Sequence, residues 1–255
     1  MRSDPTVRPI VPEIVAHRGY ASRYPENTLL ALRAALDAGA GFIEVDVLLS
    51  ADGVPVLMHD ATLSRTAGRN DHVATLSWSE LRRIEVAERS RLGDAGAGET
   101  VPSLAQLVEL LSSRPAASAF IEIKRDALAQ AGLECVVSRV LDDLMPIRER
   151  AIVISFSAEA VAHARAQGAQ RIGWVLERYD DTAHATARDL APEFLFCNHE
   201  KLPPAPAPLW AGPWSWVAYE VRDAALARAL AARGVKFIET MAVGEMVAAL
   251  GARVR

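Results

Sequence analysis

Seven ionisable residues stand at or near the ends of short apolar segments in the first half of the chain. Residues 13–17 end in a histidine that an arginine follows, and residues 42–49 and 119–124 each carry charged residues spaced two apart. Side chains two apart on a strand point to the same face, so each such pair shares one direction. A second histidine ends the run VPVLMH. The seven residues are His17, Arg18, Glu44, Asp46, His59, Glu122 and Lys124.

The three carboxylates among them predict a metal site. Burying three like charges together is costly unless a cation accompanies them. Oxygen ligands with open coordination positions suit a hard divalent ion such as Mg²⁺ or Ca²⁺, whereas a zinc site would contain more imidazole or thiolate. We therefore expect Glu44, Asp46 and Glu122 to bind Mg²⁺ or Ca²⁺.

The remaining four residues predict acid–base chemistry on an anionic substrate. Two histidines beside such an ion, His17 and His59, can serve as general base and general acid, in an order that the sequence does not assign. Arg18 and Lys124 supply the positive charge that a phosphate-bearing substrate requires. Any one of these residues alone is explained by ordinary structure; their joint placement at successive strand ends favours function. The other histidines, which we expect on the solvated surface, are His72, His163, His184 and His199.

Eight apolar segments of strand length, alternating with segments of helical spacing, would position these residues. Strands that are apolar throughout belong to parallel sheets covered on both faces. Eight strand–helix units in 255 residues predict an α/β fold, the TIM (β/α)8 barrel, in which strand ends form the catalytic mouth. A doubly wound open sheet is the alternative, but it usually has fewer strands, and no GxGxxG follows the first segment. The segments are 13–17, 42–49, 119–124, 151–156, 171–176, 194–198, 214–221 and 235–240.

Two helix starts and one insertion are predicted within a single domain covering residues 1–255. Helices are expected at 28–38 behind the cap Asn27 and at 223–232 behind the cap Asp223. Between strands two and three, residues 50–102 form a small inserted subdomain, with an extra short strand in ADGVPVLMHD and a short helix in TLSWSELRRI, before the crossover helix in TVPSLAQLVELL. Insertions in βα loops lie on the active-site face, so we expect a lid or side wall.

Composition excludes several other functions. A net charge of −4 provides no basic footprint for nucleic acid, so the expected partner is a small phosphodiester. The first 13 residues have no apolar run, and nowhere do 18 uncharged apolar residues follow one another, so we expect a cytoplasmic protein without stable membrane insertion. The oligomeric state is not indicated.

Cys135 and Cys197 are predicted to be buried, unpaired thiols. In the Pro-rich segment around Trp210, we expect the tryptophans to pack over the barrel rather than form an apolar platform.

The motifs HRG, PENT, AGAGFIEVDVLLSADGVPVLMHD, LSRT, VPSL, IEIK and GVKFIET occur in that order along nearly the whole chain. In this pattern the sequence resembles the glycerophosphodiester phosphodiesterase family. The resemblance implies a TIM barrel with an inserted subdomain, and hydrolysis of glycerophosphodiesters to glycerol 3-phosphate and an alcohol by water or through a cyclic phosphate. It also implies a metal held by Glu44, Asp46 and Glu122, an acid–base pair of His17 and His59, and phosphate contacts from Arg18 and Lys124.

The last two strands depart from the family pattern. Family members commonly have Trp-Thr-Val-Asn-Asp and Thr-Asp where this chain has YEVRD and ETM, which places Arg222 and Met241 there. We expect both near the departing alcohol, favouring neutral or anionic head groups over choline; the alternative is that Arg222 pairs with Glu220 or Asp223 at the surface. Two other functions stay open. A lysophospholipase D or sphingolipid-type phosphodiesterase would need a longer apolar channel, and a non-catalytic phospho-ligand barrel would not need both histidines.

Overall fold

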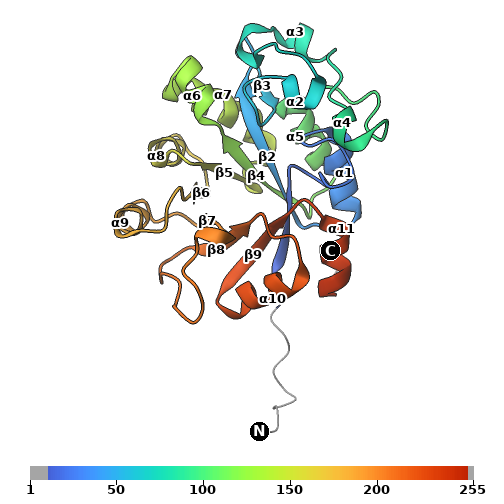
Figure 1. The fold of residues 1–255 in the computed structure, drawn as a ribbon. Coiled ribbons are helices and arrows are strands. Elements are labelled where there is room, and N and C mark those ends of the chain that lie inside the picture. Colours follow the sequence, from blue (N-terminus) through green and yellow to red (C-terminus); the bar gives the residue numbers. More distant parts are fainter. Residues whose placement is uncertain (1–10, 252–255) are drawn as a thin grey trace.

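The computed structural model describes residues 11–251, so most of the N-terminal segment considered above lies outside the described residues (Figure 1). Its centre is a closed barrel of eight parallel strands, because β1 (Glu13–His17) pairs with both β2 (Phe42–Leu49) and β9 (Val235–Thr240). This confirms the TIM barrel. The other barrel strands are β4 (Ser118–Ile123), β5 (Ala151–Ser155), β6 (Ile172–Val175), β7 (Phe194–Asn198) and β8 (Ser215–Tyr219).

Inward-facing side chains fill the barrel in layers. Phe120 is fully buried and packs edge to face against Phe194 and Phe237, with ring centroids 5.0 and 6.3 Å away. Because strand side chains alternate, the next inward residue toward the carboxyl end of each strand lies two positions further on. Above Phe120 stands Glu122, and above Phe237 stands Glu239. The apolar core therefore ends where the charged residues begin.

Helices cover the outside of the barrel (Figure 1). The second predicted cap is confirmed, because the Asp223 side chain accepts a hydrogen bond from the Leu226 amide at the start of α10. The first is wrong: Thr28, not Asn27, caps α1 by accepting a hydrogen bond from the Ala31 amide. The covering helices are α1 (Leu29–Asp37), α5 (Leu104–Ser112), α6 (Arg125–Ala131), α7 (Leu133–Leu144), α8 (Ala158–Ala166), α9 (Asp181–Leu190), α10 (Ala224–Ala232) and α11 (Val243–Leu250).

The chain between β2 and β4 contains the short elements expected of an insertion. The extra strand β3 (Pro55–Leu57) pairs antiparallel with β2, and α3 (Trp78–Leu81) is the predicted short helix. Helix α2 (Ser64–Ala67), the 3-10 turn η1 (Val73–Thr75) and α4 (Arg89–Leu92) complete the segment before α5. Two 3-10 turns lie elsewhere, η2 (Met145–Ile147) and η3 (His199–Lys201).

Several predictions about single residues are corrected by the structure. Cys197 is buried, and burial raises the pKa of its thiol to about 12, but Cys135 lies exposed on α7, because its apolar neighbours Val136 and Val137 occupy the packed face. His72 is exposed as predicted. His184 is not simply solvated, since its half-buried ring stacks on Trp210 with centroids 4.6 Å apart.

The aromatic residues around His184 form a packed cluster on the outside of the barrel. Trp210 also stacks on Tyr179 at 3.8 Å, and Trp214 and Trp216 are buried beside it. This confirms packing rather than an open platform. Among the described residues, no helix is both long enough and apolar enough to cross a membrane.

Candidate active site

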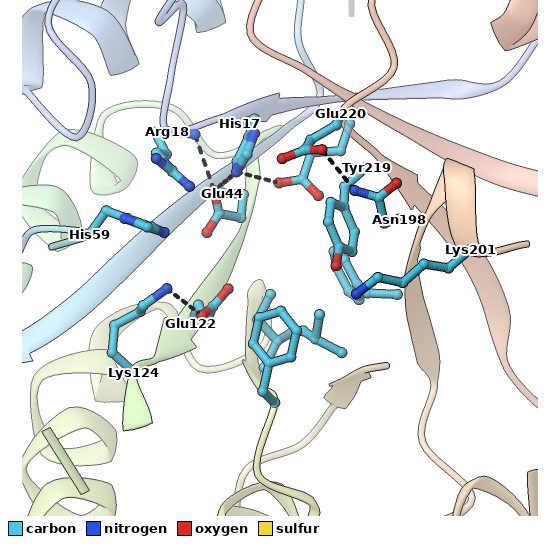
Figure 2. A pocket seen from close by; sticks show the side chains of 15 residues that line it. His17, Arg18, Glu44, His59, Glu122, Lys124, Asn198, Lys201, Tyr219 and Glu220 are labelled. Carbon is cyan, nitrogen blue, oxygen red and sulfur yellow. Dashed lines mark hydrogen bonds and ion pairs between the residues drawn. The ribbon is translucent and has the colours of Figure 1, made fainter. Parts of the chain in front are cut away.

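A cavity of about 300 Å³ opens at the carboxyl ends of the barrel strands (Figure 2). Six of the seven predicted residues line it, and the seventh, Asp46, is buried directly behind Arg18 and Lys124. The structure therefore brings all seven together. The polar lining consists of His17, Arg18, Glu44, His59, Glu122, Lys124, Asn198, Lys201, Tyr219, Glu220 and Glu239, and the apolar lining of Ile154, Phe156, Val175 and Phe196.

Strand register explains why residues far apart in the sequence meet. His17 of β1 lies directly beside Glu44 of β2, and Asp46 of β2 lies beside Glu122 of β4. Paired residues on neighbouring parallel strands point to the same side of the sheet, here the barrel interior. The charged side chains that lie two positions apart on each strand therefore form one continuous layer at the mouth of the barrel.

The turn after β1 aims the arginine of the HRG motif. Arg18 has a positive φ of 55° and Gly19 one of 84°, a region that favours glycine. A β-carbon on Gly19 would lie 2.7 Å from the backbone carbon of Ala31, so the turn packs directly on α1. The Arg18 amide donates a hydrogen bond to Glu44 Oε2 over 3.1 Å. The motif is therefore a compact turn that also anchors the first carboxylate.

Asp46 is the carboxylate with the most partners. Arg18 Nε and Lys124 Nζ each lie 3.1 Å from one of its oxygens, and Asn27 Nδ2 donates to it over 2.9 Å. Burial opposes its ionisation, yet the charges of Arg18 and Lys124 hold the pKa of Asp46 well below its usual range. Asp46 is therefore a permanent negative charge at neutral pH.

Glu44 and Glu122 are in a different electrostatic state. Burial, followed by repulsion from Asp46, raises the pKa of both carboxyl groups. Lys124 Nζ lies 2.8 Å from Glu122 Oε1, whereas Oε1 of Glu44 is buried without a hydrogen-bond partner. Glu122 therefore has one cationic partner, whereas Glu44 has only the imidazole of His17 within ion-pair distance among the described residues.

Glu44, Asp46 and Glu122 form a group of carboxylates that could hold a divalent metal ion. One oxygen from each lies within 4.8 Å of the other two. The partnerless oxygen of Glu44 and the repulsion among the three groups are the features that a bound cation would relieve. An all-oxygen donor set fits Mg²⁺ or Ca²⁺.

The two histidines face the cavity in different surroundings. His17 is buried, with Nε2 3.9 Å from Glu44 Oε2 and 3.7 Å from Glu239 Oε1. Burial and the neighbouring Arg18 lower the pKa of His17 to about 3. His59 is partly exposed, and its Nδ1 donates to Asp60 Oδ1 over 2.6 Å. Asp60 in turn accepts from Arg65 Nε over 2.7 Å, so the ring is held from outside the barrel.

An ion-pair network around the buried Glu26 and Glu88 joins the insertion to the turn after β1. Glu26 accepts from Arg18 over 3.0 Å and from both terminal nitrogens of Arg65 over 2.8 and 2.7 Å. Its amide donates to Glu88 over 2.7 Å, and Glu88 also accepts from Arg91 over 2.8 Å. The insertion therefore fixes the PENT segment and, through it, Arg18.

Sequence reasoning from spacing missed Asn27, Glu26 and Glu239. Asn27 is not the predicted helix cap: its φ is 57°, and its side chain exchanges two hydrogen bonds with Asp46, which makes it part of the site. Glu239 had a detectable signal, because it follows Phe237 by two positions as Glu122 follows Phe120. The ion pairs of Glu26 depend on the tertiary fold, and no spacing of residues along the sequence predicts them.

The expected position of Arg222 is wrong. Arg222 is exposed, and neither it nor Met241 belongs to the cavity lining. The wall on that side is formed by Lys201, Tyr219 and Glu220 (Figure 2). Within the described residues, no ion pair joins Arg222 to Glu220 or Asp223. Glu220 instead accepts a hydrogen bond from Asn198 over 2.7 Å.

The closed parallel barrel with a charged cavity at the carboxyl ends of its strands defines a TIM-barrel protein. A sequence profile of the Glycerophosphoryl diester phosphodiesterase family matches residues 17–240, and the chain belongs to this family. It is 35% identical over 150 residues to Glycerophosphodiester phosphodiesterase from Bacillus altitudinis and 32% identical over 152 residues to Glycerophosphodiester phosphodiesterase 1 from Bos taurus. Each alignment covers 59% of this chain, but 60% and 44% of the relative, so the matched region spans less than two thirds of either.

Solved structures show the same fold. A phosphodiesterase from Oleispira antarctica, determined in complex with the product sn-glycerol-3-phosphate, has a TM-score of 0.81 and 23% identity, covering 95% of this chain and 98% of its own. Glycerophosphodiester phosphodiesterase from Agrobacterium tumefaciens has a TM-score of 0.73 and 24% identity, covering 93% and 99%.

Proposed function

We propose that this protein hydrolyses glycerophosphodiesters to glycerol 3-phosphate and an alcohol, and that it needs a divalent cation to do so. The observation that carries the proposal is the single cavity where His17, His59 and the acidic cluster meet Arg18 and Lys124. Membership of the family supports it, as does the product bound to the Oleispira antarctica relative.

The cation would be held by Glu44, Asp46 and Glu122. When bound, such an ion draws negative charge from the phosphoryl oxygens and so eases attack on phosphorus. Mg²⁺ and Ca²⁺ both suit these oxygen ligands.

Arg18 and Lys124 contribute positive charge at the cavity surface. Arg18 Nη1 donates to Glu26, Nε lies 3.1 Å from Asp46 without forming a hydrogen bond, and no protein partner of Nη2 is found within residues 11–251. A guanidinium presents five N–H donors, so the unused donors can bind a phosphoryl oxygen. Hydrogen-bond donors that are held in place to stabilise the negative charge of the transition state usually make the largest contribution to such catalysis.

The two histidines would carry the protons. One takes the proton from the attacking oxygen, either of water or of the neighbouring glycerol hydroxyl, as that oxygen bonds to phosphorus. The other gives a proton to the alcohol oxygen as its bond to phosphorus breaks. If the glycerol hydroxyl attacks, water later opens the cyclic phosphate. For His59, the bond from Nδ1 to Asp60 leaves Nε2 to exchange the proton.

The cavity favours small polar alcohols over long apolar chains. Its apolar lining is confined to Ile154, Phe156, Val175 and Phe196, and its volume is about 300 Å³. The tryptophans near residue 210 pack elsewhere, so the feature that suggested a lysophospholipase D or sphingolipid substrate does not reach the site. A purely binding role would leave both cavity-facing histidines without a use. We also propose a cytoplasmic location and no nucleic-acid partner.

The test is to follow glycerol 3-phosphate release from a panel of glycerophosphodiesters before and after dialysis against a chelator. We expect turnover to stop in the metal-free protein and to return with Mg²⁺ or Ca²⁺, and we expect Asp46→Asn to lose this rescue. Full activity after verified metal removal would refute the metal dependence, and no release from any substrate would refute the proposed reaction.

A further inference from the structure

Glu239 is a buried carboxylate that the reaction proposed above does not use. It stands near the end of β9, its residue is 3% exposed, and it lines the cavity beside His17. The one basic side chain within ion-pair distance of it among residues 11–251 is His17, whose Nε2 lies 3.7 Å from Oε1, which is too long for a hydrogen bond. Within residues 11–251, no hydrogen bond to its side chain is found. A carboxylate that faces a largely buried cavity without a hydrogen-bond donor from the protein would be stabilised by a bound cation.

Positive charge is unevenly distributed among the cavity carboxylates. Asp46 contacts both Arg18 and Lys124, and Glu122 contacts Lys124. Glu44 and Glu239, by contrast, have no Lys or Arg side chain within ion-pair distance among the described residues, only the imidazole of His17, and Oε1 of Glu44 is buried without a partner. The deficit of positive charge therefore lies between Glu44 and Glu239.

We propose that His17, Glu44 and Glu239 form a second cation position, which shares Glu44 with the first. One ligand atom from each of the three residues lies within 4.8 Å of the other two. Nε2 of His17 is 3.9 Å from Glu44 and 3.7 Å from Glu239. Two ligands that are each about 2.1 Å from a common zinc ion lie at most about 4.2 Å apart, so both separations permit a shared ion.

The ligand types select a different ion from that of the first position. Three carboxylates suit Mg²⁺ or Ca²⁺, whereas one imidazole with two carboxylates suits Zn²⁺. Two adjacent positions with different preferences therefore lie in one cavity. Zinc is the ion of choice for the second.

Zinc at this position would inhibit the enzyme. Nε2 of His17 cannot both bind a metal ion and exchange a proton with substrate, because the same lone pair serves both purposes. This consequence depends on the proposed role of His17, whereas zinc binding does not. Glu239 thus supplies the additional ligand that allows zinc to bind His17 and block its proton transfer.

The test is equilibrium dialysis of the full chain against Zn²⁺ in the presence of saturating Mg²⁺. We expect about one equivalent of zinc to stay bound to the wild type. Glu239→Gln should weaken zinc binding by at least about 10-fold, because even the loss of a residue that only hydrogen-bonds to a metal ligand weakens metal binding by about that factor. Glu220→Gln is the matched control, since Glu220 lines the same cavity but is bound by Asn198, and it should bind zinc as the wild type does. Circular dichroism checks that each variant folds, and Glu239→Met serves if Glu239→Gln does not.

Two dialysis results would overturn the proposal: zinc binding that survives loss of Glu239, or zinc that Mg²⁺ displaces completely from the wild type. A second measurement follows glycerol 3-phosphate release with increasing zinc, relative to the uninhibited rate of each variant. We expect Glu239→Gln to need at least about 10-fold more zinc for the same inhibition. Glu239-dependent binding without inhibition would overturn the inhibitory role alone. An inactive wild type would refute the proposed reaction and leave the binding result intact.

Discussion

At the scale of single residues, identical carboxylates in this cavity behave differently because their neighbours differ. Asp46 is surrounded by Arg18, Lys124 and Asn27, which hold its pKa low despite burial. Glu44 and Glu239 are equally buried, but burial and nearby carboxylates raise the pKa of both well above the usual range. The protonation of each carboxyl group at the barrel mouth is therefore determined by the residues that contact its oxygens, and not by its chemical type alone.

The first prediction concerns the histidine pair. Replacing His17 or His59 by Ala should lower turnover by about 100-fold or more, because general acid–base catalysis contributes about that much. His72→Ala is the control, since His72 is exposed and outside the cavity, and its rate should not change. The measurement is glycerol 3-phosphate release by proteins with matching circular dichroism spectra. A near wild-type rate for either cavity variant would remove that histidine from the mechanism.

The second prediction concerns the head group. Lys201 lines the cavity, and within residues 11–251 no ion pair occupies its ammonium group, so it should repel cationic choline. Lys201→Gln should lower the ratio of kcat/KM for glycerophosphoinositol over glycerophosphocholine by about 2- to 5-fold, the range that a solvent-exposed charge pair of up to about 1 kcal/mol provides. Arg222→Gln, an exposed cation outside the cavity, should leave the ratio unchanged. Equal ratios in all three proteins would show that Lys201 does not select the head group.

At the scale of elements, the turn after β1 is held from two sides. Gly19 packs it on α1, and Glu26 ties it to Arg65 and Glu88 of the insertion. Loops carry function when a rigid scaffold positions them. The insertion is therefore a side wall that fixes the position of Arg18.

The third prediction tests the packing of this turn. Gly19 and Gly68 both have positive φ values, 84° and 67°, but only a β-carbon on Gly19 would meet backbone atoms, 2.7 Å away. Gly68→Ala should cost about 1–2 kcal/mol of unfolding free energy from its conformation alone. Gly19→Ala should cost about 1–3 kcal/mol more, because overpacking adds to that cost. Urea unfolding measures both, and equal losses would contradict the close packing of the turn on α1.

The fourth prediction tests the link to the insertion. Arg65→Gln should destabilise the fold by about 1.5–3 kcal/mol, the contribution of hydrogen bonds to a charged group, because Glu26 loses two of its donors while keeping Arg18. Arg69→Gln is the control, since Arg69 pairs with Asp71 at the surface, where solvent screens the ion pair, and its loss should be much smaller. Thermal or urea unfolding decides. Equal small losses would mean that the network does not hold the turn.

At the scale of the whole molecule, barrel closure determines which residues become neighbours. Pairing of β1 with both β2 and β9 brings Glu44 and Glu239 to opposite sides of His17. Their mutual repulsion is a cost that the folded state carries and the unfolded chain does not. A cation that binds the folded state should therefore stabilise the entire barrel.

The fifth prediction follows from this linkage. At a concentration about 100 times its dissociation constant, Mg²⁺ or Ca²⁺ should stabilise the fold by about 2.7 kcal/mol, or about 5–10 °C in Tm for a domain of this size. Asp46→Asn should lose most of the shift, because it removes one of the three expected ligands. Thermal unfolding with and without the ion, after chelation, is the measurement. An unchanged Tm in the wild type would argue against the site.

The sequence by itself determined the barrel and its seven charged residues, because period-two spacing and apolar strand patterns are local properties. The helix that begins behind Asp223 was predictable for the same reason, since capping involves neighbours in sequence. The tertiary structure alone decided the role of Asn27, whose side chain leaves the helix end for Asp46, and the ion pairs that Glu26 makes with the insertion. It also placed Glu239 beside His17 and left Arg222 outside the cavity. These contacts depend on the register and closure of strands that are distant in sequence. The local spacing of Glu239 after Phe237 indicates an inward side chain, but it does not indicate that His17 is its neighbour.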